Sequence, residues 1–177
     1  MRPMRRGNIV LVGFMGAGKT VCGRLLARRL GRCFVETDDL IVAREGRSIP
    51  EIFARDGEAR FRALEAEALE LLRLKSGEVI ATGGGFPCAE GRMEALRELG
   101  TVVWLRGDLR ELEARARRAG DRPMLAGRSP AEVEALYRRR EPYYAGADLV
   151  VDTTGLGVDE VVARLLAALR ERDAARV

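Results

Sequence analysis

The sequence predicts an α/β domain of three layers, α/β/α, in which helices cover both faces of a five-stranded parallel sheet. Five short apolar runs alternate along the chain with longer segments of helical periodicity, the pattern of parallel strands joined by helices. The chain has 177 residues, of which 47% are hydrophobic, and this suits one domain spanning residues 1–177 around a single core. The predicted strands are residues 8–12, 33–36, 78–82, 101–105 and 148–151.

Three of the predicted helices begin at residues that can cap them. Ser48 and Ser129 are each followed by a glutamate three positions later, the spacing of a capping box, and Pro130 suits the first position of a helix. Asp108 can cap the helix that begins LRELEARARR. The segment 117–129 is polar, contains glycine and lacks apolar periodicity, so we expect a mobile lid there.

The composition excludes several kinds of site. Histidine is absent, which excludes catalytic triads and metal sites that need imidazole, and leaves proton transfer to carboxylates, Lys, Tyr or Cys. The three cysteines, Cys22, Cys33 and Cys88, show no CxxC spacing, and we expect them to be reduced thiols.

Charge and hydropathy narrow the choice of partners. No apolar run approaches the ~20 residues needed to cross a bilayer, and the apolar run behind the basic start is too short for a signal peptide. We therefore expect a cytoplasmic protein with no membrane contact. The net charge of +4 suits an anionic small ligand, but the positive charges are too dispersed to indicate nucleic acid.

The stretch GFMGAGKT, residues 13–20, matches the phosphate-binding pattern G-x-x-x-x-G-K-[ST] and lies between a predicted strand and a predicted helix. Its glycines let successive backbone N–H groups surround phosphate oxygens, its lysine reaches the β- and γ-phosphates, and its threonine hydroxyl coordinates Mg²⁺. Lys19 and Lys75 are the only lysines in an arginine-rich chain, which indicates that Lys19 is required as a compact ammonium. The predicted nucleotide-binding residues here are Gly13, Gly16, Ala17, Gly18, Lys19 and Thr20.

The phosphate-binding loop does not by itself name the phosphoryl acceptor, which could be water, a nucleotide, a nucleic acid end or a metabolite. In parallel sheets, ligands gather at the carboxyl ends of the strands. The sequence ETDD, 36–39, follows the second strand and three glycines, 83–85, follow the third. Arginines lie in RFRALE, 60–65, and in YRRREPYY, 137–144. We expect acidic groups, bare backbone and arginines around one cleft.

From about residue 8 to residue 170 the chain resembles the shikimate kinase family. The resemblance rests on six motifs in order: GFMGAGKT, FVETDD, RSIPEIFARDGEARFRALE, TGGG, DRPML and RRREPYY. It implies a P-loop kinase fold similar to that of nucleoside monophosphate kinases, with a five-stranded parallel sheet and a lid. It also implies transfer of the γ-phosphoryl group of ATP to the 3-hydroxyl of shikimate, on the route to chorismate and aromatic amino acids.

The same resemblance implies roles for residues at the acceptor site. Asp38 matches the aspartate that contacts the reacting hydroxyls of shikimate, where it can orient the nucleophile and accept its proton. Arg62 and Arg140 match the arginines that hold the shikimate carboxylate, a task suited to the guanidinium fork. Gly84 and Gly85 match backbone that contacts the substrate. We expect a side chain at these glycines to intrude on the bound ring.

On the nucleotide side, Arg122 matches a lid arginine that reaches the transferring phosphoryl group, and so joins Lys19 and Asp38 as a predicted catalytic residue. Arg115 matches a residue that stacks on adenine, although an exposed helix arginine is an alternative interpretation. Phe53, Phe61 and Glu65 match pocket-wall and supporting positions, with core packing an equally good account of the two phenylalanines, and Asp39 is expected to be solvated or structural.

The match departs from the family pattern at the expected metal site. The family usually shows Asp-x-Asp after the second strand, whereas this chain has Glu36-Thr37-Asp38. Glu36 keeps the charge but adds a methylene, so we expect retained activity with altered Mg²⁺ binding. The third strand ends in glycine rather than in the acidic residue of a usual Walker B motif, which leaves Thr20 and water as the main expected metal ligands, with Glu36 weaker.

Two alternatives remain open from the residues alone. One is another small-molecule kinase, such as a gluconate kinase or a nucleoside monophosphate kinase, in which the two arginines would bind a different anion. The other is a regulatory or nucleic-acid-binding NTPase, against which only 5% of residues are aromatic and no basic-aromatic stripe occurs. The expected partners are ATP, Mg²⁺ and shikimate, with no nucleic acid, and the expected state is a monomer.

Overall fold

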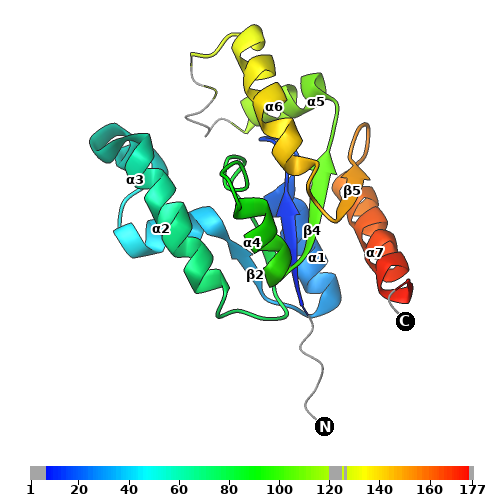
Figure 1. Ribbon diagram of the computed structural model, residues 1–177. Coiled ribbons are helices and arrows are strands. Elements are labelled where there is room, and N and C mark those ends of the chain that lie inside the picture. Colours follow the sequence, from blue (N-terminus) through cyan, green and yellow to red (C-terminus); the bar gives the residue numbers. More distant parts are fainter. Residues whose placement is uncertain (1–6, 120–124, 126, 176–177) are drawn as a thin grey trace.

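The computed structural model describes residues 7–119, 125 and 127–175. This part of the chain forms five strands and seven helices, with one or two helices between successive strands (Figure 1). In chain order they are β1 (Asn8–Val12), α1 (Lys19–Leu30), β2 (Phe34–Glu36), α2 (Thr37–Glu45), α3 (Ile49–Leu72), β3 (Val79–Ala81), α4 (Arg92–Leu99), β4 (Gly100–Arg106), α5 (Leu109–Arg118), α6 (Pro130–Tyr144), β5 (Leu149–Asp152) and α7 (Val158–Ala174).

The strands form one parallel sheet in the order β2-β3-β1-β4-β5. All five predicted strands are present, and each end lies within one residue of the predicted one. β1 lies at the centre of the sheet, and every one of its residues is buried, because helices cover both of its faces. This explains why residues 8–12 read as a continuous apolar run rather than as an alternating one.

Helices lie on both sides of the sheet, so the predicted three-layer architecture is confirmed. In Figure 1, α4 lies in front of the central strands and α1 behind them, and α1 packs against α7. α2 packs against α3 beyond the β2 edge of the sheet, and α5 packs against α6 near the carboxyl end of β4. The loops that follow the carboxyl ends of the strands therefore lie between α3 and α6 (Figure 1).

The predicted helix caps are present. Ser48 and Ser129 each form a capping box with the glutamate three residues later, and Asp108 accepts hydrogen bonds from two backbone N–H groups of α5. One feature of α3 was not predicted: Gly57, with φ +78°, interrupts the helical backbone. The left-handed conformation suits glycine there and bends α3 between its two halves.

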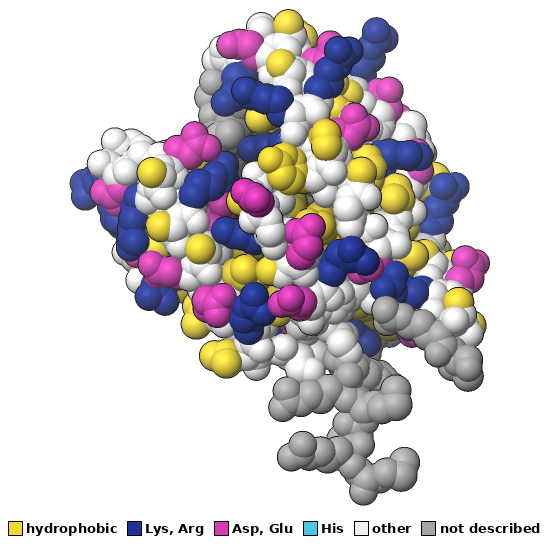
Figure 2. Space-filling view, in the orientation of Figure 1, with side chains coloured by type: hydrophobic (Ala, Val, Ile, Leu, Met, Phe, Trp, Pro, Cys, Tyr) yellow, Lys and Arg dark blue, Asp and Glu magenta, His cyan; other side chains and the backbone are white. Residues whose placement is uncertain are grey.

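The surface carries both signs of charge. On the face shown in Figure 2, basic and acidic side chains are interspersed, in keeping with the small net charge. Cys22, Cys33 and Cys88 are all free. Among the described helices, none is both long enough and apolar enough to cross a membrane. Of the predicted lid, 117–129, residues 120–124 and 126 lie outside the described part of the chain.

Candidate active site

The loop between β1 and α1 has the backbone of a phosphate cradle. Gly13, Gly16 and Gly18 all have positive φ, at 147°, 78° and 83°, a region that other residues rarely adopt. A Cβ on Gly16 would lie 2.0 Å from the backbone oxygen of Leu112, so this glycine also allows α5 to approach the loop. Gly18 is the N-cap of α1 and supplies no side-chain cap, so the helix start remains available to an anion.

Lys19 is buried at the start of α1 and turns back over the loop. Its side chain is 7% exposed, and Nζ donates to the backbone oxygens of Gly13 at 2.7 Å and Phe14 at 2.9 Å. These contacts stabilise the ammonium inside the loop. The positive charge is therefore held where phosphate oxygens would enter.

Thr20 and Glu36 lie in contact beside the loop. The Thr20 hydroxyl donates to Glu36 Oε1 at 2.6 Å, and Arg24 lies 3.9 Å from the other carboxylate oxygen of Glu36. Because the hydroxyl donates its proton to Glu36, its oxygen lone pairs remain available. A hydroxyl and a carboxylate are hard oxygen ligands of the kind Mg²⁺ prefers, so this pair fits the ion together with phosphate and water oxygens.

Asp38, in the first turn of α2, carries a carboxylate oxygen without a partner. Its Oδ1 atom is buried and accepts no hydrogen bond within the described part of the chain. Burial raises the pKa of Asp38 to about 6, and the nearby carboxylates of Glu65 and Glu36 add to the rise, whereas Lys19 opposes it. Asp39 is exposed, as expected. Asp38 is therefore the acidic group here that is poised to accept a proton.

The three glycines after β3 allow side chains of the site to approach the backbone. None of Gly83, Gly84 and Gly85 has positive φ, so the triplet is not required by a left-handed turn. A Cβ on Gly83 would lie 2.9 Å from Asp38 Oδ1. A Cβ on Gly84 would lie 3.2 Å from Arg140 Nη1 and 3.6 Å from the Gly13 oxygen of the phosphate loop.

The same triplet meets both arginines that the sequence assigned to the acceptor. A Cβ on Gly85 would lie 2.9 Å from Arg62 Nη1 and 3.0 Å from Arg140 Nη2. The structure thus brings Asp38, Arg62 and Arg140 together at one strand end, as predicted. We expected a side chain at these glycines to intrude on the bound ring. In the structure it would first collide with the protein's own side chains, which already occupy the space next to the glycines.

A buried carboxylate holds Arg62 in place and lies near two further arginines. Glu65 on α3 is 2% exposed and accepts from Arg62 Nη1 at 2.7 Å. Burial raises the pKa of Glu65, and three neighbouring guanidinium groups oppose that rise. They belong to Arg62, Arg92 and Arg140. Arg62 also pairs with Glu58 at 3.1 Å, whereas no described carboxylate lies within ion-pair distance of Arg92 or Arg140, and these two guanidinium groups suit an anionic ligand.

Three residues at this site were not assigned from the sequence. Thr37 is buried and its hydroxyl accepts from the Gly83 N–H at 3.0 Å. Arg92, at the start of α4, lies over the Phe86 ring at 4.8 Å, and its buried Nη1 has no partner within the described residues. Tyr144 donates to the Gly84 oxygen. Thr37 and Tyr144 lie inside recognised motifs, whereas nothing in the sequence around Arg92 distinguishes it from the many other arginines.

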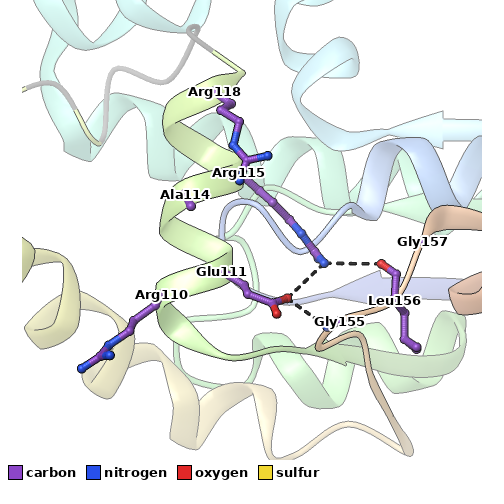
Figure 3. Close-up of a pocket in the computed structure, with 8 residues that line it drawn as sticks. All are labelled: Arg110, Glu111, Ala114, Arg115, Arg118, Gly155, Leu156 and Gly157. Carbon is purple, nitrogen blue, oxygen red and sulfur yellow. Dashed lines mark hydrogen bonds and ion pairs between the residues drawn. The ribbon is translucent and has the colours of Figure 1, made fainter.

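A hollow lies between α5 and the loop after β5 (Figure 3). Its volume is about 590 Å³, and Arg115 reaches across it from α5. The Arg115 guanidinium donates to Glu111 at 3.2 Å and to the backbone oxygen of Leu156 at 3.4 Å. Arg115 is therefore a lining residue of a pocket rather than a free surface arginine, and its place beside a nucleotide base stays a prediction.

The remaining predicted residues divide into two groups. Phe53 and Phe61 contact each other, with ring centroids 4.7 Å apart, and both belong to the core or pack against it. The Arg62 guanidinium lies 5.5 Å from the Phe61 centroid, so Phe61 also borders the acceptor site. Arg122, the predicted lid arginine, lies outside the described residues.

A five-stranded parallel sheet with a phosphate-binding loop between β1 and α1 defines the class of P-loop kinases. The sequence pattern of the family "SKI: Shikimate kinase" matches residues 15–170, and the chain belongs to the shikimate kinase family. This confirms the resemblance carried by the six motifs. The alternative of a gluconate kinase or nucleoside monophosphate kinase is not favoured.

Individual relatives cover nearly the whole chain. The shikimate kinase of Moorella thermoacetica is 47% identical over 93% of this chain and 95% of its own length. That of Geobacter sulfurreducens is 48% identical over 93% of this chain and 91% of its own length. The solved structure of the Acinetobacter baumannii shikimate kinase in complex with shikimate superposes with a TM-score of 0.88, at 34% identity and 94% coverage of both chains.

Proposed function

We propose that this chain transfers the γ-phosphoryl group of ATP to the 3-hydroxyl of shikimate, giving shikimate 3-phosphate and ADP. Membership of the shikimate kinase family supports this activity, and the Acinetobacter baumannii relative was solved with shikimate bound. The observation that carries the proposal is the convergence of an unpartnered Asp38 oxygen and two guanidinium groups on glycines 83–85. A hydroxy acid needs these two kinds of contact, an acceptor for its reacting hydroxyl and donors for its carboxylate.

At the reacting end, Asp38 orients the 3-hydroxyl and accepts its proton as the oxygen attacks phosphorus. The free Oδ1 and the raised pKa support this role, because a base of pKa about 6 is ionised at neutral pH and still accepts a proton readily. Lys19 now contacts carbonyls of its own loop, and it exchanges those contacts for β- and γ-phosphate oxygens when the nucleotide enters.

At the other end, Arg62 and Arg140 bind the shikimate carboxylate. Glu65 orients the Arg62 fork through the bond at 2.7 Å, and the Phe14 ring lies 6.0 Å from the Arg140 guanidinium carbon. A guanidinium held by packing loses little conformational freedom when it forms a bidentate pair. The backbone of Gly84 and Gly85 completes the contact with the substrate.

Mg²⁺ is the cofactor we propose, held by the Thr20 hydroxyl with Glu36 as a direct or water-mediated partner. When bound, the ion neutralises charge on the transferring phosphate. Arg115 lies against the adenine in the pocket of Figure 3, and Arg122 in the lid contributes a further cation to the phosphoryl group. We also expect one domain, 1–177, acting as a cytoplasmic monomer without nucleic acid or membrane.

A substrate panel tests the proposal. The purified protein is given ATP and Mg²⁺ with shikimate, gluconate, a nucleoside monophosphate, RNA or no acceptor, and ADP and phosphorylated product are both quantified. We expect ADP to form in step with shikimate 3-phosphate and only slowly without shikimate. Transfer to gluconate or a nucleotide but not to shikimate would reject the proposed acceptor. ATP turnover stimulated only by RNA would favour the regulatory NTPase.

A further inference from the structure

Tyr144, in the last turn of α6, is fully buried next to Gly84, and no role in substrate binding has been assigned to it above. Its side chain is 0% exposed, and its hydroxyl donates to the backbone oxygen of Gly84 at 2.7 Å. Its ring packs against Trp104, with centroids 5.9 Å apart. Burial raises the pKa of Tyr144 well above its ordinary value, so the phenol keeps its proton and remains a donor.

The hydrogen bond from Tyr144 fixes the orientation of one peptide group. The Gly84 oxygen and the Gly85 N–H belong to the same planar unit, and the peptide bonds of the described residues are trans. The oxygen and the hydrogen of a trans peptide point in opposite directions. A Gly84 oxygen held toward Tyr144 therefore turns the Gly85 N–H away from Tyr144. This restraint matters because the peptide joins two glycines, Gly84 and Gly85, whose backbones rotate at low cost.

The Gly85 N–H has no hydrogen-bond acceptor within the part of the chain that the structure describes. The nearest groups to the Gly85 Cβ position are the guanidinium nitrogens of Arg62 and Arg140, and these cannot accept a hydrogen bond. An N–H without a partner, next to two guanidinium groups, is suited to an anionic oxygen from outside the protein.

The other carbonyls of the triplet are held by the backbone itself. The Gly83 oxygen accepts from the Phe86 N–H at 3.0 Å, and the Gly85 oxygen accepts from the Cys88 N–H at 3.0 Å. Among the described residues, the Gly84 oxygen has no backbone donor of this kind. Besides the phenol, the one other donor to it in this part of the chain is the Cys88 thiol at 3.6 Å, a weak donor. The phenol is therefore the strong restraint on the central peptide.

We propose that Tyr144 is a positioning residue for the acidic substrate. By holding the Gly84 carbonyl, it keeps the Gly85 N–H directed at the carboxylate that Arg62 and Arg140 bind. Arg140 lies one turn earlier on α6, so the same helix supplies both a carboxylate ligand and the group that orients the backbone donor. The inference rests on the proposed function, because it concerns how the proposed substrate is held.

The test is the Tyr144→Phe variant, which removes only the hydroxyl. We expect the KM for shikimate to rise about tenfold, the cost of weakening one hydrogen bond to a charged group, while kcat and the KM for ATP stay within about twofold. Tyr143→Phe is the matched control, because Tyr143 is the preceding residue of the same helix and is 41% exposed. Its kinetic constants should equal those of the wild type.

A loss of folded protein cannot imitate this result, since it lowers the apparent kcat and leaves KM unchanged. Adding Cys88→Ala to Tyr144→Phe removes the remaining donor to the Gly84 oxygen and should raise the KM for shikimate further. An unchanged KM in both variants, with an active wild type, would overturn the inference alone, as would equal increases in the KM for shikimate and for ATP. A wild type that transfers no phosphoryl group to shikimate would overturn the proposed function, and this inference with it.

Discussion

The Oδ1 atom of Asp38 lies 2.9 Å from the position that a Cβ atom would take on Gly83. Cβ atoms in proteins essentially never come so close to another heavy atom, so even alanine at this strand end would displace the carboxylate. Gly83 is also held by the Thr37 hydroxyl, next to Asp38 in the chain. The residues just after β3 and the first turn of α2 are therefore joined by a hydrogen bond and packed closely beside the proposed base.

Gly83→Ala and Gly85→Ala should have different kinetic effects. The Gly83 Cβ would contact Asp38, so kcat should fall about tenfold or more because the proposed base is misplaced. The Gly85 Cβ would contact the ends of Arg62 and Arg140, so the KM for shikimate should rise. Neither glycine needs positive φ, so backbone strain does not interfere with the comparison. Steady-state kinetics with both substrates varied will show whether the two effects separate; identical profiles would count against the division of roles.

The raised pKa of Asp38 predicts an acid limb in the pH profile. At neutral pH a carboxyl of pKa about 6 is ionised and can accept a proton, and below that pH it is protonated and cannot. We therefore expect kcat/KM for shikimate to fall as the pH drops through about 6 and to approach a tenfold loss per pH unit below it. Direct quantification of the phosphorylated product from pH 4.5 to 8 measures this. A profile that stays flat down to pH 5 would exclude Asp38 as the titrating base.

Asp38→Asn should abolish turnover but stabilise the free protein at neutral pH. The folded pKa lies above the unfolded value of 3.8, so the folded state binds the proton more tightly, and its stability decreases as pH rises through about 6. The asparagine amide is uncharged and so avoids the cost of burying an ionised carboxylate. We expect the free energy of unfolding at pH 7 to rise by roughly 1–3 kcal/mol, and this gain to shrink toward zero near pH 4. Urea unfolding at both pH values measures the gain. A near-normal kcat in this variant would contradict the role of Asp38.

Glu36→Ala should raise the Mg²⁺ concentration needed for half-maximal rate more than it raises the KM for shikimate. The substitution removes the acceptor of the Thr20 hydroxyl and a carboxylate from the proposed metal site. Glu36→Asp is the control, because it keeps the charge and shortens the side chain by one methylene. Titration of activity with Mg²⁺ at saturating ATP gives the comparison. An alanine variant with unchanged metal dependence would remove Glu36 from the site.

Arg140→Ala should mainly weaken shikimate binding, with a KM increase of about a hundredfold if a charge-assisted pair is lost. Arg139 is the matched control, since it is the neighbouring residue of α6 and is exposed, whereas Arg140 is 8% exposed. Arg139→Ala should leave both KM values unchanged. Equal effects of the two substitutions would indicate general electrostatic attraction rather than a specific contact.

Much of the fold could be predicted because its signals are local. The apolar runs locate the strands, and Ser48, Asp108 and Ser129 begin helices through bonds to residues at most three positions away. The bend at Gly57 was missed because a single glycine within a helical pattern is compatible with a continuous helix.

The part of the site that lies within recognisable sequence motifs could be predicted. The spacing of GFMGAGKT identifies the phosphate loop, and ordered motifs place Asp38, Arg62 and Arg140 among the candidates. The motifs do not show that Arg92 lies on the Phe86 ring. That contact depends on the path of the loop between β3 and α4, which no short-range pattern specifies.

The order of residues alone established a parallel α/β kinase with a phosphate loop, since strand periodicity, capping and glycine spacing act over a few positions. Only the folded chain decided that the Asp38 oxygen has no partner among the described residues, that the pKa of Asp38 rises to about 6, and that Tyr144 holds the Gly84 peptide across 60 positions of sequence. Burial and hydrogen bonding between distant segments exist only after packing excludes water and brings those segments together.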